Sequence, residues 1–495
     1  MTHYIKRVLL ASFILFVPNA HAQNKTDDLA EKLDQFVEKL NNRLGTFPGF
    51  SVSVVQGDKI LIDKGYGVAN TKTQEPFTKD TYSYLASGTK AFVGLTVAIL
   101  AERGELDLDA PIGTTYLHDM NQESLGLIGT VSFKQLLNHT HGLSGEAIGL
   151  RTAYTGDFTD EQIWYLLRHL NRAETGQAFE YSNLGYVAAS YVLEHIYKEP
   201  WQTLVARTVL APAALNKTIF KVSDLLDKSV AQPHQWQGTL KQVPIYKRDK
   251  TMHAAGGQYA TSSDIARWLL LNLNDGELNG ERIWPAAAVQ LIRAPLATVD
   301  ESFYNFHRKT YGLGWYNSDY EGDDLYHHFG AYTGYRVHIS MMPKIQLGVS
   351  VLSNAADPAN GFIPDMIATY VYDIALGKDG VEEKFEAEIK ALEGRIAPYK
   401  GKTMPQRPRN APDNEQIYAG HYKNSLVGDW DIRMENNQVR LHWGQLSSDI
   451  TFTTRNAVDY IRFELTGNGY LAEIIRTKDH TIAGFKFHGE FLKRQ

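Results

Sequence analysis

The sequence contains no cysteine among its 495 residues. This absence excludes disulfide bonds, a thiolate nucleophile, metal or iron–sulfur sites with cysteine ligands, and a cysteine-linked lipid anchor. Excess basic charge is also missing, because 50 Lys and Arg residues stand against 56 Asp and Glu residues, for a net charge of −6. Nucleic acid is therefore not an expected partner, since its binding generally needs a basic surface.

Long hydrophobic runs are equally scarce. The one membrane-like segment lies near the N-terminus, where two basic residues precede an apolar stretch over residues 8–17 that is too short to span a bilayer. Small residues follow up to Ala22, and this order is typical of a cleavable secretory signal. We predict a signal peptide over residues 1–22 and a mature chain from about Gln23, periplasmic or secreted in a bacterium, without a stable membrane anchor. An uncleaved N-terminal anchor is the alternative.

The length of the chain predicts more than one domain, because a single hydrophobic core rarely serves so many residues. A hydrophobic share of 43% and a charged share of 21% are ordinary for globular proteins. Apolar periodicity and turn residues then predict the elements. In chain order these are a helix over 27–44, a hairpin over 50–62, a buried helix over 89–102, a mostly helical section with long loops over 108–273, strands over 335–342 and 347–352, and helices over 365–375 and 382–392.

A change of pattern near the C-terminal end indicates a separate module. Residues 397–416 are rich in proline and basic residues, which favours a linker. From residue 417 onward, short segments alternate apolar and polar residues and are separated by turn residues. This pattern predicts a small antiparallel β-barrel over residues 417–495.

Ser87 and Lys90 stand at the start of the predicted buried helix. A spacing of three residues places both side chains on one helical face, one turn apart. The helix N-terminus adds partial positive charge and a free backbone N–H at Ser87. One turn therefore supplies a nucleophile, an amine that acts as base or electrostatic helper, and one donor for an oxyanion. The alternative is a solvated pair that caps a structural helix.

Tyr181 and Asn183 form a Tyr-x-Asn motif just before another predicted helix. The functional interpretation makes Tyr181 a phenolate base and Asn183 a hydrogen-bond partner of Lys90 and of the substrate. An ammonium at ~4 Å and an effective dielectric of ~20 contributes roughly 4 kcal/mol, enough to lower the pKa of Tyr181 from about 10 towards 7. A tyrosine that only packs at a helix entrance is the alternative, and Tyr422 begins a second match that we interpret as structural.

His328 and Gly330 form a His-x-Gly motif that precedes Ala331 and a predicted strand. On an edge strand beside Ser87, His328 is expected to polarise Tyr181 or the substrate. Gly330 is expected to leave room for substrate, and the Ala331 N–H to be the second oxyanion donor, each such donor contributing roughly 3 kcal/mol. A second match that begins at His442 lies in the predicted barrel and is interpreted as structural.

Taken in order, the three motifs resemble those of the penicillin-recognising serine hydrolases of the class C beta-lactamase type. The resemblance implies a domain over residues 23–396 of α/β (α+β) class, in which an antiparallel sheet flanked by helices carries a mainly helical subdomain. It implies catalytic roles for Ser87, Lys90 and Tyr181, a small-molecule or peptide substrate, and no metal or cofactor. The terminal module resembles the lipocalin-like barrel of some D-aminopeptidase-like and esterase-like members.

The third motif departs from the beta-lactamase pattern, which has Lys-Thr-Gly where this chain has His328. Because histidine is usually neutral at pH 7, a permanent positive charge is missing. This favours an esterase or D-amino-acid peptidase. A true class C beta-lactamase and a non-catalytic sensor that binds cell-wall peptides remain as alternatives. The histidines at 139 and 141 lack the partners of a metallo-hydrolase motif, and Ser144 lacks the second glycine of a nucleophile elbow, so we interpret this segment as structural.

Overall fold

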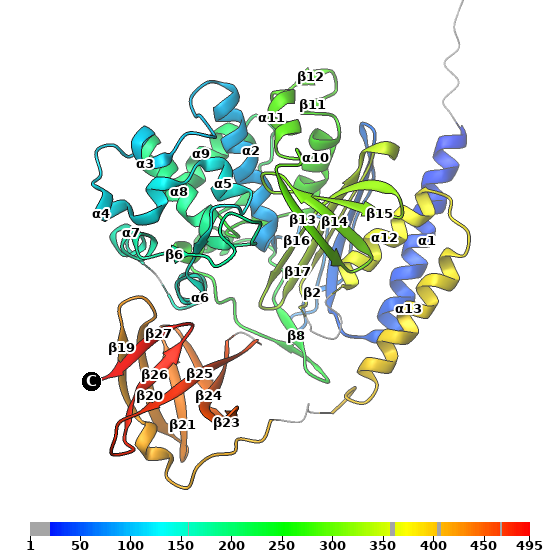
Figure 1. Cartoon of the computed structure of the whole chain (residues 1–495). Helices are drawn as coiled ribbons and strands as arrows, with labels where there is room; N and C mark the ends of the chain where they lie inside the picture. The colour runs from blue at the N-terminus through cyan, green and yellow to red at the C-terminus, as the bar shows by residue number, and fades with distance from the viewer. Residues whose placement is uncertain (1–19, 157, 357–361, 403–406, 466–467) are drawn as a thin grey trace, which may run out of the picture.

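The largest sheet of the structure joins strands from both ends of the N-terminal part of the chain (Figure 1). The computed structural model describes residues 20–156, 158–356, 362–402, 407–465 and 468–495, so the predicted signal segment up to residue 19 lies outside the described residues. All neighbouring strands in this sheet are antiparallel. From edge to edge the strands are β13 (Ala297–Phe303), β14 (Phe306–Tyr311), β15 (Tyr316–Tyr320), β16 (Asp323–Tyr332), β17 (Tyr335–Met342), β18 (Leu347–Ser353), β1 (Gly49–Gln56), β2 (Lys59–Asn70) and β3 (Glu75–Pro76).

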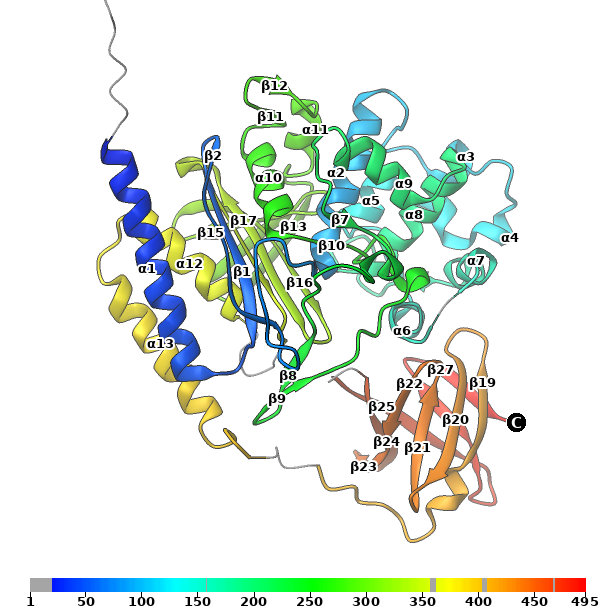
Figure 2. The same ribbon diagram turned by 180° about the vertical axis from the view of Figure 1, so that it is seen from behind.

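The central strands are apolar on both faces, so helices must cover both. In β18, Val349 and Val351 belong to one buried cluster, whereas Leu352 faces the other. Figure 2 shows the two helical layers on opposite sides of the sheet. One layer consists of α1 (Ala20–Leu44), α12 (Ile363–Ala375) and α13 (Val381–Ile396), and the other of α2 (Thr89–Glu102), α10 (Ser262–Leu273) and α11 (Ala286–Leu291). The predicted helices over 27–44, 89–102, 365–375 and 382–392, the hairpin and both predicted strands are confirmed.

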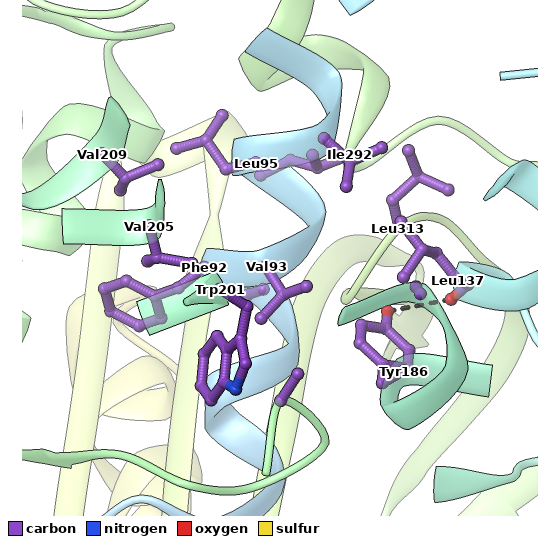
Figure 3. Packing of buried hydrophobic residues seen from close by; sticks show 14 of the residues in the cluster. Phe92, Val93, Leu95, Leu137, Tyr186, Trp201, Val205, Val209, Ile292 and Leu313 are labelled. Atoms are coloured by element: carbon purple, nitrogen blue, oxygen red, sulfur yellow. Dashed lines mark hydrogen bonds between the residues drawn. The ribbon is translucent and has the colours of Figure 1, made fainter. Parts of the chain in front are cut away.

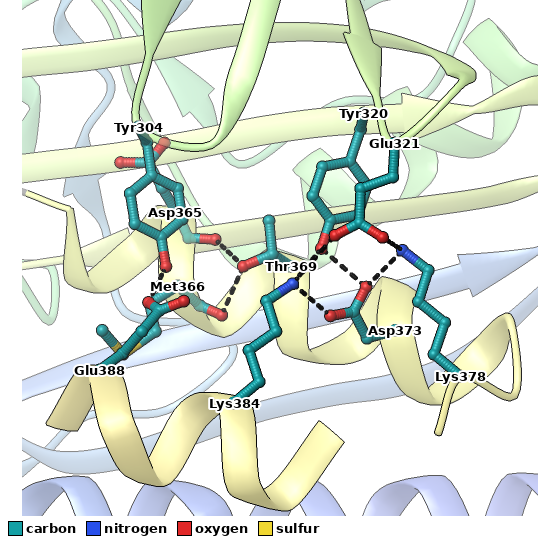
Figure 4. A network of polar contacts seen from close by, with 10 residues as sticks. All are labelled: Tyr304, Tyr320, Glu321, Asp365, Met366, Thr369, Asp373, Lys378, Lys384 and Glu388. Carbon is teal, nitrogen blue, oxygen red and sulfur yellow. Dashed lines mark hydrogen bonds and ion pairs between the residues drawn. The ribbon is translucent and has the colours of Figure 1, made fainter. Parts of the chain in front are cut away.

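A buried polar network fixes α13 and the end of α12 to the sheet (Figure 4). The carboxylate of Asp373 is buried and accepts hydrogen bonds from the hydroxyl of Tyr320 and from Nζ of Lys384, both at 2.7 Å. Lys378 adds an ion pair with the same carboxylate at 2.9 Å. A buried charge is tolerated only where it is paired and hydrogen-bonded, and this one is.

The helix α2 is buried on every side, as its sequence predicts. The ring of Phe92 stacks on Trp268 with 3.7 Å between ring centres. At Gly94 an added Cβ would lie 1.7 Å from the carbonyl oxygen of Leu313, so only glycine permits this close approach. Figure 3 shows the packing of this region, with labels on Phe92, Val93, Leu95, Leu137, Tyr186, Trp201, Val205, Val209, Ile292 and Leu313. The surrounding core therefore fixes the start of α2, where Ser87 and Lys90 lie.

A mainly helical subdomain packs beside α2 (Figure 1). Its helices are α3 (Ile112–Thr115), α4 (Gln122–Leu125), α5 (Phe133–Leu137), α6 (Glu146–Tyr154), α7 (Asp160–Arg168), α8 (Asn183–Tyr197) and α9 (Trp201–Val205). The section over 108–273 is predicted to be mostly helical with long loops, and the longest stretch without an α-helix covers residues 211–261, where prolines at 212, 233 and 244 interrupt the chain. Short strand pairs complete the subdomain and its surroundings: β4 (Ser83–Tyr84), β10 (Tyr259–Ala260) and β7 (Thr218–Ile219) in one sheet, β5 (Leu143–Ser144) with β6 (Asn171–Arg172), β8 (His234–Trp236) with β9 (Leu240–Gln242), and β11 (Glu277–Leu278) with β12 (Glu281–Arg282).

The C-terminal part forms a nine-stranded antiparallel sheet that is nearly closed into a barrel, as predicted. Its interior is filled by aromatic side chains, among them Trp430, Trp443, Phe463, Phe485 and Phe487. Among the described residues, no helix has the length and apolarity required to cross a bilayer. In sheet order the strands are β22 (Leu446–Asp449), β21 (Gln438–Trp443), β20 (Gly428–Glu435), β19 (Gly420–Asn424), β27 (Glu490–Arg494), β26 (Ile482–Phe487), β25 (Asn468–Arg476), β24 (Val458–Leu465) and β23 (Thr451–Arg455).

The barrel docks against α6 of the helical subdomain (Figure 1). Arg151 donates to the carbonyl oxygen of Ser425 at 2.7 Å, and the side-chain amide of Gln445 donates to the carbonyl oxygen of Tyr154 at 2.8 Å. His488 lies 2.9 Å from the carboxylate of Glu146 at the other end of α6. These contacts place the barrel beside the cavity described below, because α6 forms part of its wall.

Candidate active site

Ser87 lies in a tight turn between β4 and α2. The turn is a short 3-10 helix over Ala86–Gly88, and Ala86 has a φ of +46°, which L-residues rarely adopt. The hydroxyl of Thr89 donates to the Ala86 carbonyl at 2.8 Å and holds this turn. Gly256 lies against the same backbone, since an added Cβ would be 3.2 Å from the Ala86 carbonyl carbon. Ser87 is thereby fixed in a half-buried position between fully buried neighbours.

The amine of Lys90 reaches Ser87, as the spacing predicts. Its Nζ lies 3.1 Å from the hydroxyl oxygen of Ser87 and donates to the side-chain oxygen of Asn183 and the carbonyl oxygen of Ala255, both at 2.7 Å. The last two groups can only accept hydrogen bonds, so they occupy two N–H groups of the amine. The remaining tetrahedral direction points at Ser87, where a neutral amine presents its lone pair.

The environment of Lys90 favours that neutral form. Lys90 is fully buried, and burial lowers the pKa of its amine well below the ordinary value. No carboxylate within the described part of the chain forms an ion pair with it. Lys90 is therefore suited to accept the proton of Ser87 as a general base.

Tyr181 lies beside the same amine, but its pKa is shifted in the opposite direction from the one expected. Nζ of Lys90 is 4.9 Å from the centre of the Tyr181 ring. The ring of His139 packs against the Tyr181 ring, with 4.5 Å between the ring centres. Burial raises the pKa of Tyr181, and the nearby Ser87 hydroxyl opposes this only in part. The predicted phenolate is therefore wrong for this structure, because a buried Lys90 that loses its proton no longer supplies the attracting charge. Tyr181 is a neutral phenol that can donate a proton.

Asn183 occupies the position expected of it. It is the first residue of α8, after Ser182, whose hydroxyl accepts from the N–H of Leu184 at 3.2 Å and caps the helix. The Asn183 side chain is exposed to the cavity while its oxygen accepts from Lys90. Its amide N–H groups are thus available to a substrate.

His328 does not point towards the nucleophile. Its Nδ1 lies 2.7 Å from the carbonyl oxygen of Phe329, which can only accept, so Nδ1 carries the proton. Its Nε2 therefore accepts from the hydroxyl of Tyr311 at 3.1 Å. Burial and the proximity of Lys90 lower the pKa of His328 well below its ordinary value, which keeps it neutral. The expected polarisation of Tyr181 by His328 is thus corrected: both ring nitrogens of His328 are hydrogen-bonded to other groups, and the two rings lie 6.2 Å apart.

Gly330 allows two backbone segments to pack closely and does not line the cavity. An added Cβ would lie 2.0 Å from the carbonyl oxygen of Leu85, the residue that precedes the Ser87 turn. The expectation that Gly330 leaves room for substrate is thus corrected: its lack of a side chain brings β16 against the turn.

Ala331 follows on the same strand, which ends in a hairpin where Tyr332 pairs with Tyr335 across two turn residues. Because hydrogen-bonded pairs alternate along such a hairpin, the Ala331 N–H points away from β17, and the Ser87 turn contacts β16.

These groups meet in one cavity of about 500 Å³. Ser87, Tyr181, Asn183 and Ala331 line it, whereas His328 and Gly330 do not. Its other lining residues are Tyr84, Ala86, Leu143, Ser144, Gly145, Glu146, Gly149, Leu150, Ala153, Tyr154, Glu180, Ser182, Leu184, Lys247, His253, Ala255, Gly256 and Tyr332.

Several residues that contact the site lie outside the three motifs, so the sequence assigns them no role. Ala255 accepts from Lys90, and Tyr311 donates to His328. His139 accepts from the backbone N–H of Ser182 at 3.2 Å, and His141 accepts from that of Leu143 at 2.9 Å, in agreement with the structural interpretation of both histidines.

Comparisons with known proteins show the family and the fold. The profile of the family described as Beta-lactamase matches residues 31–368. Protein flp from Staphylococcus aureus (strain N315) is 25% identical over 335 residues, which are 66% of this chain and 64% of that protein. The chain thus spans less than two thirds of the length of this relative.

Two solved structures share the fold. The octameric penicillin-binding protein homologue from Pyrococcus abyssi superposes with a TM-score of 0.59 at 22% identity, covering 94% of this chain and 99% of that one. The D-amino acid amidase from Ochrobactrum anthropi SV3 superposes with a TM-score of 0.57 at 20% identity, covering 72% of this chain and 99% of that one. The profile match over most of the chain leads to one conclusion. The chain belongs to the beta-lactamase family, which supports serine hydrolase chemistry in general.

Proposed function

We propose that the protein is an exported serine hydrolase that cleaves an ester or amide bond through an acyl-enzyme on Ser87. One observation carries the proposal: the buried amine of Lys90 has two of its positions occupied by acceptors and directs the third at the Ser87 hydroxyl. That arrangement activates a serine without a histidine or a metal ion. Export is supported by the signal-like pattern of residues 1–22.

Acylation begins when the Ser87 oxygen attacks the substrate carbonyl carbon and its proton passes to neutral Lys90. The N–H groups of Ser87 and Ala331 hold the negative oxygen that forms. Tyr181 then donates its proton to the leaving oxygen or nitrogen as the carbonyl–leaving group bond breaks. Lys90 returns its proton to Tyr181, so both side chains are neutral again and the proton of Ser87 has been transferred to the leaving group.

Deacylation follows the same route in reverse with water as the nucleophile. Water attacks the acyl carbon and gives its proton to the Tyr181–Lys90 pair, and the bond to the Ser87 oxygen breaks as Ser87 recovers a proton from Lys90. Asn183 holds Lys90 in place throughout, because its oxygen accepts one of the amine N–H groups.

The substrate class is an ester or a D-amino-acid amide. The amide is supported by similarity to a D-amino acid amidase, and the loss of the third-motif lysine argues against efficient hydrolysis of β-lactams. The neutral, inward-facing His328 offers no permanent charge for a β-lactam carboxylate. The terminal barrel, which we propose to be lipocalin-like in architecture, has a filled interior and supports α6.

The test compares Ser87→Ala with Ser144→Ala, a serine that lines the same cavity far from Lys90 in sequence. p-Nitrophenyl acetate, D-amino-acid p-nitroanilides and the chromogenic cephalosporin nitrocefin are the substrates. We expect turnover of an ester or anilide by the wild type and by Ser144→Ala, and none by Ser87→Ala. Equal activity in Ser87→Ala would exclude the mechanism, and no turnover by a folded wild type would favour the non-catalytic peptide sensor. Cell fractionation with N-terminal sequencing of the mature protein tests export and cleavage near Gln23.

A further inference from the structure

A second lysine is buried in the cavity wall, and the mechanism above makes no use of it. Lys247 is 4% exposed, and its Nζ donates to the carbonyl oxygens of Ala153 at 2.9 Å and Thr251 at 3.1 Å. Within the part of the chain that the structure describes, no carboxylate pairs with it. An ammonium buried without a counter-ion is costly, so its retention here calls for a partner that the described residues do not supply.

Unused hydrogen-bonding groups surround this amine. The two carbonyls occupy two of the three N–H groups of the ammonium, which leaves the third uncommitted. The ring of Tyr332 lies 4.6 Å from Nζ, and the Tyr332 hydroxyl is buried without a partner among the described residues. Nδ1 of His253 is likewise buried without a hydrogen-bond partner among the described residues. All three residues line the cavity that contains Ser87.

The acidic residues of the cavity do not neutralise Lys247. Glu146 is exposed and pairs with His488 of the barrel, and Glu180 is exposed and accepts from the hydroxyl of Thr175. Burial lowers the pKa of Lys247 to about 7, and a carboxylate bound beside it would favour its charged form. The positive charge that the third motif lacks is thus available from a different part of the chain.

We propose that Lys247, Tyr332 and His253 form a subsite for a carboxylate of the substrate, which makes acyl compounds with a negative charge the preferred substrates. The proposal rests on the proposed function, since the subsite adjoins Ser87 in the same cavity. The carboxylate belongs either to the acyl chain or to the leaving group. It also disfavours a substrate whose nearby group is a free ammonium, as in an unblocked D-amino-acid amide.

The test uses two pairs of esters at about pH 6, where a lysine of pKa about 7 keeps its proton. For the acyl chain, p-nitrophenyl hydrogen glutarate is compared with p-nitrophenyl valerate. For the leaving group, 3-acetoxybenzoate is compared with phenyl acetate. The wild type is expected to favour the charged member of one pair by about tenfold or more in kcat/KM, through KM, as a charge-assisted contact allows.

Lys247→Met is expected to lose that preference and to keep its activity on the neutral esters. Lys250→Met is the matched control, because Lys250 lies on the same loop with its side chain 62% exposed, and it is expected to behave as wild type. If Lys247→Met does not fold, Tyr332→Phe removes only an unpartnered hydroxyl and is expected to weaken the preference. No preference in either pair, or a preference that survives Lys247→Met, would overturn the proposal.

A separate measurement distinguishes this subsite from the proposed function. Glutarate binding is followed by calorimetry with wild type, Ser87→Ala and Lys247→Met. Binding by the first two and not by the third supports the subsite even if no ester is hydrolysed. If esters are hydrolysed and glutarate and the charged esters show no advantage, the subsite fails while the hydrolase stands.

Discussion

Replacing Lys90 by alanine tests whether its amine acts as a general base or only as a positive charge. Among the described residues the Lys90 amine has three hydrogen-bond partners and no carboxylate partner, with Ser87 at the third position. A positioned general base contributes about 10²- to 10⁴-fold to the rate, which corresponds to roughly 3 to 5 kcal/mol of barrier. We therefore expect Lys90→Ala to lose about that factor in kcat/KM on p-nitrophenyl esters.

Chemical rescue tests the role of the missing group. Propylamine is expected to restore part of the activity of Lys90→Ala through its neutral form, because the alanine leaves space beside Ser87. In wild type, kcat/KM falls as the pH drops through the lowered pKa of Lys90, since protonation removes the base. In the rescued variant this fall moves up to the ordinary pKa of an alkylamine, about 10.

Two results would refute this reasoning. Rescue by tetramethylammonium to the same extent as by propylamine would show that only positive charge is needed at this position. Activity of Lys90→Ala within about fivefold of wild type, well inside the loss expected for a base, would show that the amine is not the base. Ser87→Ala with propylamine is the control, and thermal unfolding of each variant shows that it is folded.

Tyr181→Phe is expected to lower kcat about 10²- to 10⁴-fold for poor leaving groups and less for p-nitrophenolate, which needs no proton; equal losses for both would contradict the role of proton donor. Gly330→Ala places a Cβ 2.0 Å from the Leu85 carbonyl, so we expect a destabilisation of roughly 1–3 kcal/mol in urea unfolding together with lost activity, and a wild-type unfolding curve would contradict the packing. Lys247 has a folded pKa of about 7 against 10.5 when unfolded, so the unfolded state binds more protons and wild-type stability rises with pH in this window. Relative to Lys247→Met, wild type should gain roughly 2 kcal/mol of unfolding free energy between about pH 7 and 9, and a constant difference would contradict the burial of its charge.

The sequence predicts best what lies within one turn or one periodic segment. Ser87 and Lys90 are three residues apart on a helix whose apolar pattern is unambiguous, so their contact follows from helical geometry alone. The sheet, its helical layers and the terminal barrel follow from apolar periodicity together with the family resemblance. The meeting of Tyr181 and Asn183 with that pair follows only from the resemblance, because some ninety residues of chain intervene.

What the sequence could not predict depends on packing between distant segments. The pKa of Tyr181 rises because His139 and other buried groups enclose it, and no local pattern reports that enclosure. His328 turns towards Tyr311 because that hydroxyl lies within reach at the end of β14, which is separated from β16 by one strand of the sheet. Lys247 belongs to no motif, and its burial depends on α6 and the loop to Thr251 packing around it.

The most direct measurement is to map where a fluorophosphonate probe binds covalently, by tryptic digestion and mass spectrometry. We predict one phosphonyl group on the oxygen of Ser87, absent in Lys90→Ala unless propylamine is added. A label on Ser144 or on another residue, or none on a folded protein, would contradict it.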